Sequence, residues 1–139
     1  MHEQIRVVIV DDHPGVRAGI RRLLSPAKDI LVVAEGTNGL EAIQLAETYN
    51  PDVMLLDVEL PKMRGDEVVR KIRDAQPAVK VLAVSSYNER LYVQGMMENG
   101  SFGYITKDEA PELLIEAVRH VSKGENKWVS PRALRYISK

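Results

Sequence analysis

The sequence predicts an α/β fold built on a doubly wound, five-stranded parallel sheet. Five short runs rich in β-branched residues recur along the 139 residues, and each is apolar almost throughout, which is typical of parallel strands covered on both faces. A segment with helical periodicity follows each run. Strict alternation of strands and helices implies right-handed crossovers and one sheet with helices on both sides. At 45% hydrophobic residues, the chain is expected to form one compact domain.

The five expected strands are the apolar runs at residues 5–10, 30–36, 52–58, 79–86 and 102–107. The five expected helices carry apolar residues at the spacing of one helix face. These residues are Val16, Ile20, Leu23 and Leu24 in the first helix, Leu40 and Ile43 in the second, Val68, Val69 and Ile72 in the third, Leu91, Val93, Met96 and Met97 in the fourth, and Leu113, Leu114, Ala117, Val118 and Val121 in the fifth.

Several helix ends carry residues that favour a start or a stop. Pro14 suits the first turn of a helix, and Asn38 is expected to cap the second helix, with Glu41 three residues later. Gly100 and Gly124 are expected just beyond the ends of the fourth and fifth helices. The chain is therefore divided into a domain at residues 1–124 and a tail at residues 125–139. The tail shows no sixth strand, and only a short helix capped by Ser130–Pro131 is expected there.

Composition excludes several classes of protein. Nineteen basic and 20 acidic side chains leave a net charge of −1, so no excess of positive charge favours binding to nucleic acid or an anionic membrane. The absence of cysteine excludes disulfides and thiolate zinc sites. Neither a signal peptide nor an apolar run of roughly 18 residues is present, so no membrane span is expected and a cytoplasmic location is favoured.

Chemically reactive side chains follow four of the five expected strands. They are Asp11 and Asp12 after the first strand, Asp57 on the third, Ser85 on the fourth and Lys107 after the fifth. In open α/β sheets, ligands bind at the carboxyl ends of the strands. With the strand order 2-1-3-4-5 of the flavodoxin-like arrangement, these four strands are neighbours, so we expect one site.

The acids favour a hard cation and phosphoryl chemistry. Three crowded carboxylates repel one another or collect a metal ion, and oxygen ligands without sulfur favour Mg²⁺. A cation beside Asp57 would reduce its repulsion of an incoming phosphoryl group, which Asp57 would attack as a nucleophile. Lys107 and Ser85 would each hold a phosphoryl oxygen.

Each of these residues, taken alone, also has an ordinary explanation. Paired aspartates often form turns or helix caps, Ser85 can be a strand-end hydroxyl, and Lys107 a surface lysine. His13 could ligate a metal, but a single histidine more commonly belongs to the turn or the helix that follows. The prediction therefore depends on the four positions occurring together.

The motifs "VVIVDDHPGVRAGI", "PDVMLLDVELPKMRGDEVV", "VLAVSS" and "GSFGYITKDE" resemble, in this order, the receiver domain of bacterial two-component response regulators (CheY-like). The resemblance covers residues 5–124. It implies phosphotransfer from a sensor histidine kinase to Asp57, with self-catalysed dephosphorylation rather than conventional enzyme activity. It also implies direct Mg²⁺ binding by Asp12, Asp57 and the backbone carbonyl of Glu59, with Asp11 acting mostly through water.

The resemblance further implies a switch. Ser85 would move toward the phosphoryl group, Tyr104 would turn inward, and the surface of the fourth helix, fifth strand and fifth helix would change shape. Glu59 and Tyr87 lie two residues after Asp57 and Ser85, where side chains tune the lifetime of the phosphorylated state.

Within the family, the sequence is most similar to receivers of LuxR/FixJ-type (NarL-like) transcription factors, in which a helix-turn-helix domain follows. The chain ends at Lys139, so a fragment of a longer regulator is favoured over a free-standing receiver, and DNA would be bound only through the absent domain. A homodimer formed on phosphorylation is also expected, with Ile115 as a candidate contact.

Other functions compete with this interpretation. The stretch "LLDVE" is similar to the nucleophile motif of haloacid dehalogenase-type phosphatases, although their motif follows the first strand. A receiver-like interaction module independent of phosphate should have lost an acid or the lysine, and all are present. A flavin carrier is less favoured, because acids after the first strand would repel a cofactor phosphate.

Overall fold

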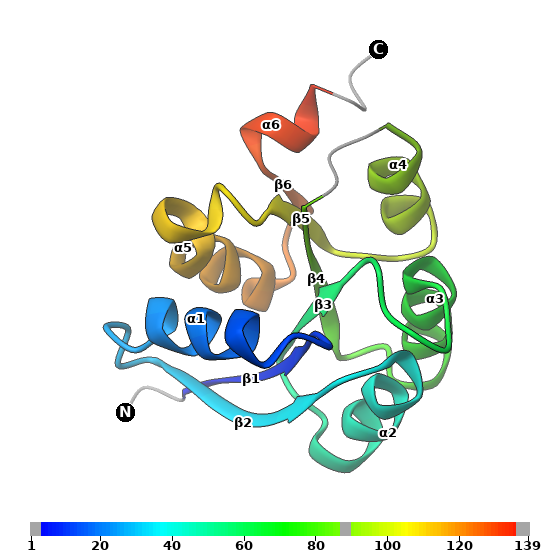
Figure 1. Cartoon of the computed structure of the whole chain (residues 1–139), viewed down its shortest axis with the longest axis horizontal. Helices are drawn as coiled ribbons and strands as arrows, with labels where there is room; N and C mark the ends of the chain where they lie inside the picture. Colours follow the sequence, from blue (N-terminus) through cyan, green and yellow to red (C-terminus); the bar gives the residue numbers. More distant parts are fainter. Residues whose placement is uncertain (1–3, 87–89, 136–139) are drawn as a thin grey trace.

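The computed structural model describes residues 4–86 and 90–135, without the side chains of residues 90 and 91 (Figure 1). The sheet is parallel, and its strand order is β2-β1-β3-β4-β5-β6. The strands are β1 (Ile5–Val10), β2 (Ile30–Gly36), β3 (Val53–Asp57), β4 (Lys80–Ser85), β5 (Gly103–Thr106) and β6 (Trp128–Val129). The helices are α1 (Pro14–Leu24), α2 (Gly39–Tyr49), α3 (Gly65–Ala75), α4 (Arg90–Glu98), α5 (Ala110–Lys123) and α6 (Pro131–Leu134). The predicted fold class and the order 2-1-3-4-5 are confirmed.

The helices form two layers, one on each face of the sheet (Figure 1). Alternate residues of β1 point to opposite faces: Val7 and Ile9 pack in a core with α1 and α5, whereas Val8 and Val10 pack in a second core with α2, α3 and α4. All four of these side chains are at most 1% exposed. Burial on both faces explains why the strand runs are continuously apolar.

The predicted helix ends are also found. The side chain of Asn38 accepts a hydrogen bond from the Glu41 N–H at 2.9 Å, so Asn38 caps α2. Glu41 does not complete a capping box, because its Oε1 accepts from the N–H and the hydroxyl of Thr37 instead. Gly124 follows α5 with φ of 67°, in the left-handed region that favours glycine.

The expectation of no sixth strand is wrong. Trp128 and Val129 pair in parallel with Gly103 and Tyr104 and so cover the edge of β5. Because only two residues pair, the strand carries no periodic signal in the sequence. A side chain at position 103 would place its Cβ 2.8 Å from the Trp128 carbonyl oxygen, so glycine permits the approach. The short helix capped by Ser130 is confirmed, since the Ser130 Oγ accepts from the Ala133 N–H.

Two further findings bear on the expected surfaces. Ile115, the candidate dimer contact, is half-buried and packs in part against the core beneath α1 and α5, so it is less available at the surface than a dimer contact was expected to be. Among the described residues, no helix combines the length and the apolar character that crossing a membrane requires.

Candidate functional site

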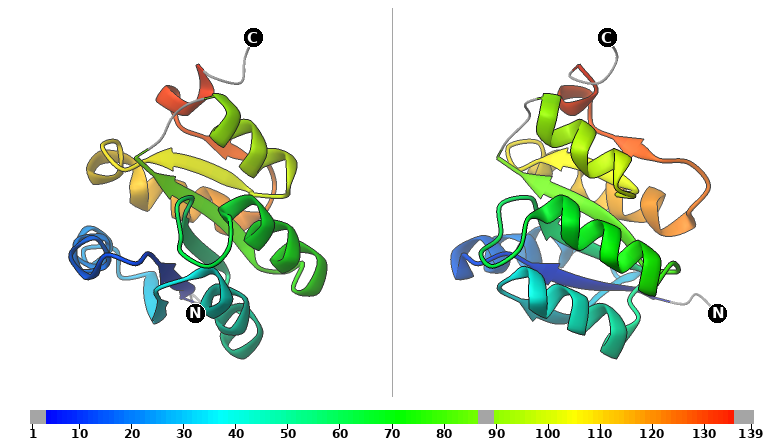
Figure 2. Two further views of the ribbon diagram at one scale, coloured as in Figure 1. Left: turned by 45° about the vertical axis from the view of Figure 1, so that its right-hand side comes forward. Right: turned by 90° about the vertical axis from the view of Figure 1, so that its right-hand side faces the viewer.

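The parallel strands bring their carboxyl ends to one end of the sheet (Figure 2). Asp57 is the last residue of β3, Ser85 is the last of β4, Asp11 directly follows β1, and Lys107 directly follows β5. These four residues are far apart in the sequence, and the adjacent parallel strands bring them close together in space. The structure therefore brings these residues to the same end of the sheet, as the strand order led us to expect.

Lys107 links two carboxylates that are almost entirely buried. Its Nζ lies 3.0 Å from Oδ2 of Asp11 and 3.5 Å from Oδ2 of Asp57, which are only 2% and 5% exposed. The other oxygen of Asp57 accepts a hydrogen bond from the Glu59 N–H at 3.2 Å. The lysine partly compensates two buried negative charges that would otherwise repel each other.

The two acids titrate differently because their surroundings differ. Burial raises the pKa of Asp57 to about 6, and the charge of Asp11 adds to this effect while that of Lys107 opposes it. Burial also acts to raise the pKa of Asp11, but hydrogen bonds from the His13 N–H and from Lys107 outweigh it and lower that pKa. Asp57 is therefore the more basic of the two carboxylates.

His13 belongs to the acidic cluster, although its sequence context favoured a role in the turn. It occupies the cap position of α1, and its Nδ1 lies 3.2 Å from Asp11 Oδ1 and 3.0 Å from Asp12 Oδ1. One ligand atom each of Asp11, Asp12, His13 and Asp57 can be chosen so that all lie within 4.8 Å of one another. In the sequence, only its position next to Asp12 indicated that His13 could belong to the cluster. Its proximity to Asp57 is evident only in the folded structure.

An open cavity of about 390 Å³ gives access to Asp57. Its lining comprises Asp12, His13, Asp57, Glu59, Ser86 and Lys107. Ser86 was not singled out in the sequence, whereas Ser85 beside it is completely buried. Ser86 lies one residue beyond β4 and is exposed, and it is the serine that lines the cavity. Tyr87, the other expected tuning residue, lies outside the described residues.

Ser85 pairs with Tyr104 beneath this cavity. Both side chains are 0% exposed, so Tyr104 is a fully buried strand residue. Burial raises the pKa of Tyr104 to about 12, against the effect of its hydrogen bond with Ser85. The ring already occupies the inward position that the switch was expected to create.

Residues 7–119 match the response regulator receiver domain family. The chain belongs to this family. Over 136 residues, and 98% of its own length, the receiver domain is 38% identical to the transcriptional regulatory protein DegU of Brevibacillus brevis. Over 123 residues, and 88% of its length, it is 37% identical to the nitrate/nitrite response regulator protein NarL of Escherichia coli K12. In both comparisons it spans 57% of the relative's length.

Solved structures give the same assignment. The receiver domain superposes with a TM-score of 0.92 on a two-component response regulator of the LuxR family from Aurantimonas sp. SI85-9A1, with 32% identity over 98% of this chain and 96% of that chain. The TM-score is 0.84 for the signal receiver domain of the putative NarL from Mycobacterium tuberculosis, with 35% identity over 88% and 99%. The predicted NarL-like class is confirmed, and we do not retain the phosphatase interpretation.

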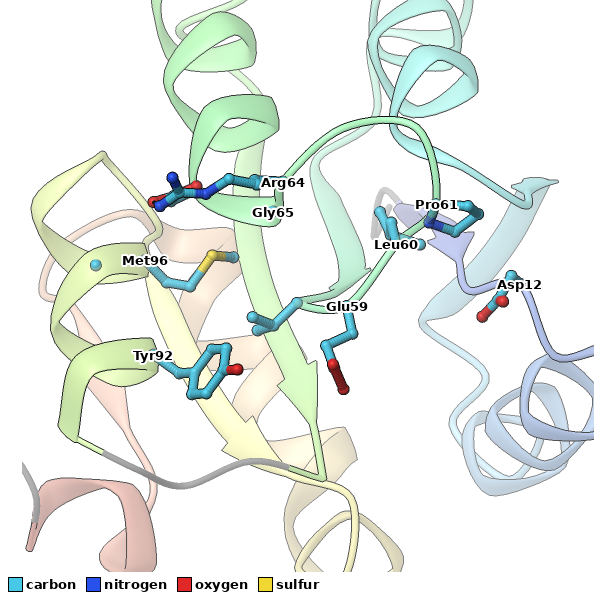
Figure 3. A pocket seen from close by; sticks show the side chains of 11 residues that line it. Asp12, Glu59, Leu60, Pro61, Arg64, Gly65, Tyr92 and Met96 are labelled. Atoms are coloured by element: carbon cyan, nitrogen blue, oxygen red, sulfur yellow. Dashed lines mark hydrogen bonds and ion pairs between the residues drawn. The ribbon is translucent and has the colours of Figure 1, made fainter.

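A larger groove of about 630 Å³ adjoins the acidic cavity of the receiver domain. Figure 3 shows Tyr92 and Met96 extending from α4 on one side and Glu59 and Leu60 on the loop after β3 on the other. Leu60 is partly buried and packs against the core on this side of the sheet. Glu59 borders both hollows, so its carboxylate lies where it can influence access to Asp57.

Proposed function

We propose that Asp57 accepts a phosphoryl group from a sensor histidine kinase and that this modification controls transcription through a LuxR-type output domain. The supporting observation is the position of Asp57: a buried carboxylate with raised pKa, open to one cavity, with Lys107 at 3.5 Å. Domain assignment follows the same proposal, with residues 1–124 as receiver and residues 125–139 as the connection toward the output domain. The expected cytoplasmic location is part of this proposal.

The transfer would use an oxygen of Asp57 as the nucleophile. This oxygen attacks the phosphorus, the P–N bond of the phosphohistidine breaks, and the leaving imidazole nitrogen keeps the bonding electron pair and takes up a proton. An acyl phosphate on Asp57 results. Because the pKa of Asp57 is about 6, the carboxylate is mostly ionised at neutral pH and ready to attack.

Receiver domains generally bind Mg²⁺ at an acidic cluster, and the donor set here fits such an ion. Three carboxylates and one imidazole converge, and oxygen dominates, as a hard cation requires. Asp12, Asp57 and the Glu59 carbonyl would hold Mg²⁺ directly, and Asp11 would act through water. When bound, the ion supplies positive charge that offsets the negative charge of the incoming phosphoryl group.

Lys107 and Ser85 would then bind oxygens of the phosphoryl group on Asp57. Lys107 would exchange part of its contact with Asp57 for a phosphoryl oxygen, and Ser85 would have to leave its hydrogen bond with Tyr104 to reach another. Loss of that bond would shift the population of conformations at α4, β5 and α5, where a homodimer contact is also proposed. Glu59 and Tyr87 would set the lifetime of the acyl phosphate.

Incubation with acetyl phosphate and Mg²⁺, followed by intact mass measurement, tests the proposal. One phosphoryl adduct is expected, and it should be absent in Asp57→Asn and after chelation. Asp74→Asn is the matched control, because this acid is exposed and distant from the cluster. An adduct that persists in Asp57→Asn would reject the assignment of the phosphoacceptor.

A further inference from the structure

The C-terminal clasp, defined here as residues 128–135, is bound along β5 and the turn that follows it (Figure 2). The Trp128 N–H donates to the Phe102 carbonyl at 3.0 Å, and the Ser130 N–H donates to the Tyr104 carbonyl at 2.9 Å. Ser130 and Ala133 are both 0% exposed, and Ala133 belongs to the same core as Tyr104. The clasp is therefore a packed part of the domain, in a region where the sequence indicated only a tail.

Glu109 fastens the clasp to the end of β5. Its Oε1 accepts from the Thr106 hydroxyl at 2.7 Å and from the Thr106 N–H at 3.2 Å. Its Oε2 accepts from the Arg132 N–H at 3.1 Å. Although partial burial acts to raise the pKa of Glu109, hydrogen bonds from Ser130, Thr106 and Arg132 lower it. One carboxylate therefore joins the strand, the turn and the clasp.

A second contact joins the same two parts. Arg132 forms an ion pair with Asp108, whose carboxylate also accepts from the Thr106 hydroxyl at 2.6 Å. This pair is exposed on both sides, so it is expected to contribute less than the Glu109 carboxylate. Substitutions at Arg132 and at Glu109 should therefore weaken the attachment of the clasp to different extents.

The turn held by the clasp is also the turn that carries Lys107. Residues 106–109 are consecutive. Asp108 and Glu109 contact Arg132 of the clasp, and Thr106 donates to both of their carboxylates. Lys107, between them, contacts Asp11 and Asp57 instead. The Lys107 N–H donates to the Ser85 carbonyl at 2.8 Å, which ties the turn to β4 as well. A shift of this turn must therefore move both Lys107 and the contacts of the clasp.

We propose that Glu109 is a positioning residue. Through Glu109, the docked clasp holds the turn at residues 106–109 in the conformation that places Lys107 beside a phosphoryl group on Asp57. Occupation of the site in turn strengthens docking of the clasp. The inference rests on the proposed function. The coupling must be reciprocal. If docking of the clasp raises the affinity of the site for a phosphoryl group by some factor, a filled site raises the docking equilibrium of the clasp by the same factor. Preorganisation of Lys107 is the physical source of the effect.

Trp128 makes the clasp directly observable, because it is the only tryptophan in the sequence and it lies in β6. The experiment is a titration with beryllofluoride and Mg²⁺, followed by Trp128 emission and by amide hydrogen exchange of residues 128–135. In the unaltered chain we expect a change in emission and slower exchange in the clasp. In Glu109→Ala, we expect the apparent dissociation constant for beryllofluoride to rise about fivefold or more, and the protection of the clasp to be lost.

Three variants calibrate the result. Arg132→Ala keeps the backbone N–H that bonds Glu109, so a smaller effect is expected. Glu109→Gln keeps one acceptor oxygen, so its affinity for beryllofluoride should lie between those of the unaltered chain and Glu109→Ala. If circular dichroism shows that Glu109→Ala is unfolded, Glu109→Gln takes its place in the test. Glu112→Ala removes an exposed acid in the first turn of α5 and should match the unaltered chain.

Two failures can be told apart in parallel samples. If acetyl phosphate gives no adduct on the unaltered chain, the proposed function fails and this inference fails with it. If the adduct forms, but beryllofluoride leaves Trp128 and clasp exchange unchanged or binds folded Glu109 variants with unaltered affinity, the inference alone is overturned.

Discussion

The Nζ of Lys107 lies 3.0 Å from Oδ2 of Asp11, closer than its 3.5 Å distance to Asp57, so in this state of the protein the lysine is primarily the partner of Asp11. Asp11 is only 2% exposed and cannot rely on water to stabilise its charge. Lys107, which is expected to bind a phosphoryl oxygen, thus also stabilises the folded structure around the two buried acids.

Replacing this lysine should destabilise the protein. In Lys107→Met the two buried carboxylates lose their shared cation, and we expect the free energy of unfolding to fall by about 1 to 3 kcal/mol at pH 7. The pKa of Asp57 should rise further, since the lysine charge acts to lower it. Urea unfolding and NMR titration of Asp57 measure the two effects, and an unchanged stability together with an unchanged pKa would contradict this account.

Replacing Asp57, the proposed nucleophile, should have the opposite effect on stability. The pKa of Asp57 is raised from 3.8 to about 6, so in the absence of metal the folded state retains a proton that the unfolded chain has lost. The contribution of Asp57 to folding stability should therefore decline as the pH rises from about 4 to about 6, and Asp57→Asn should lack that contribution.

At pH 7.5 without metal, Asp57→Asn is expected to be more stable than the unaltered chain by about 1 to 3 kcal/mol. The difference should shrink toward zero near pH 4, where Asp57 is protonated in both states. Paired urea denaturation curves across this range test the prediction, and a gain that is independent of pH would show that burial of the charge is not its cause.

Magnesium should stabilise the folded chain by mass action. At ten times its dissociation constant, a bound ion adds about 1.4 kcal/mol to the free energy of unfolding. Thermal unfolding with and without Mg²⁺ should show this gain in the unaltered chain and in Asp74→Asn, but not in Asp12→Asn or Asp57→Asn. Equal gains in all four proteins would place the ion elsewhere.

The buried pair of Ser85 and Tyr104 should behave as an interacting unit. Ser85→Ala and Tyr104→Phe each remove one side of a hydrogen bond inside the core and should each cost about 1 kcal/mol. The double variant should cost less than the sum, by about 0.5 kcal/mol or more. A double-mutant cycle from chemical denaturation measures the coupling, and strict additivity would exclude the bond.

Two glycines offer a matched test of packing near the site. A Cβ at position 65 would lie 2.6 Å from the carbonyl oxygen of Val58, a backbone atom that cannot swing aside, whereas a Cβ at position 19 meets nothing within 4 Å. Gly65→Ala should therefore cost about 1 to 3 kcal/mol, and Gly19→Ala inside α1 should stabilise the protein by about 0.5 to 1 kcal/mol. Thermal denaturation of both variants provides the comparison, and a stabilising Gly65→Ala would be inconsistent with the observed close approach.

Local patterns in the sequence determined much of this molecule. The apolar runs located five strands because burial on both faces leaves a signal within each run, and Asn38 and Gly124 marked helix ends because capping is a contact between near neighbours. The acids and Lys107 could be assigned to one site because parallel strands end at a common edge. The sequence alone was thus sufficient for the fold class and for the prediction that these side chains lie together.

Only the tertiary structure decided which residues contact one another in and around the site. The burial of Tyr104, the preference of Lys107 for Asp11, the approach of His13 to Asp57 and the attachment of the clasp through Glu109 all depend on contacts between segments distant in the chain. Such contacts leave no periodic trace in either segment, because each partner alone has the composition of an ordinary loop or strand end. Their distances are set by the packing of the sheet and its two helix layers, which exists only in the folded chain.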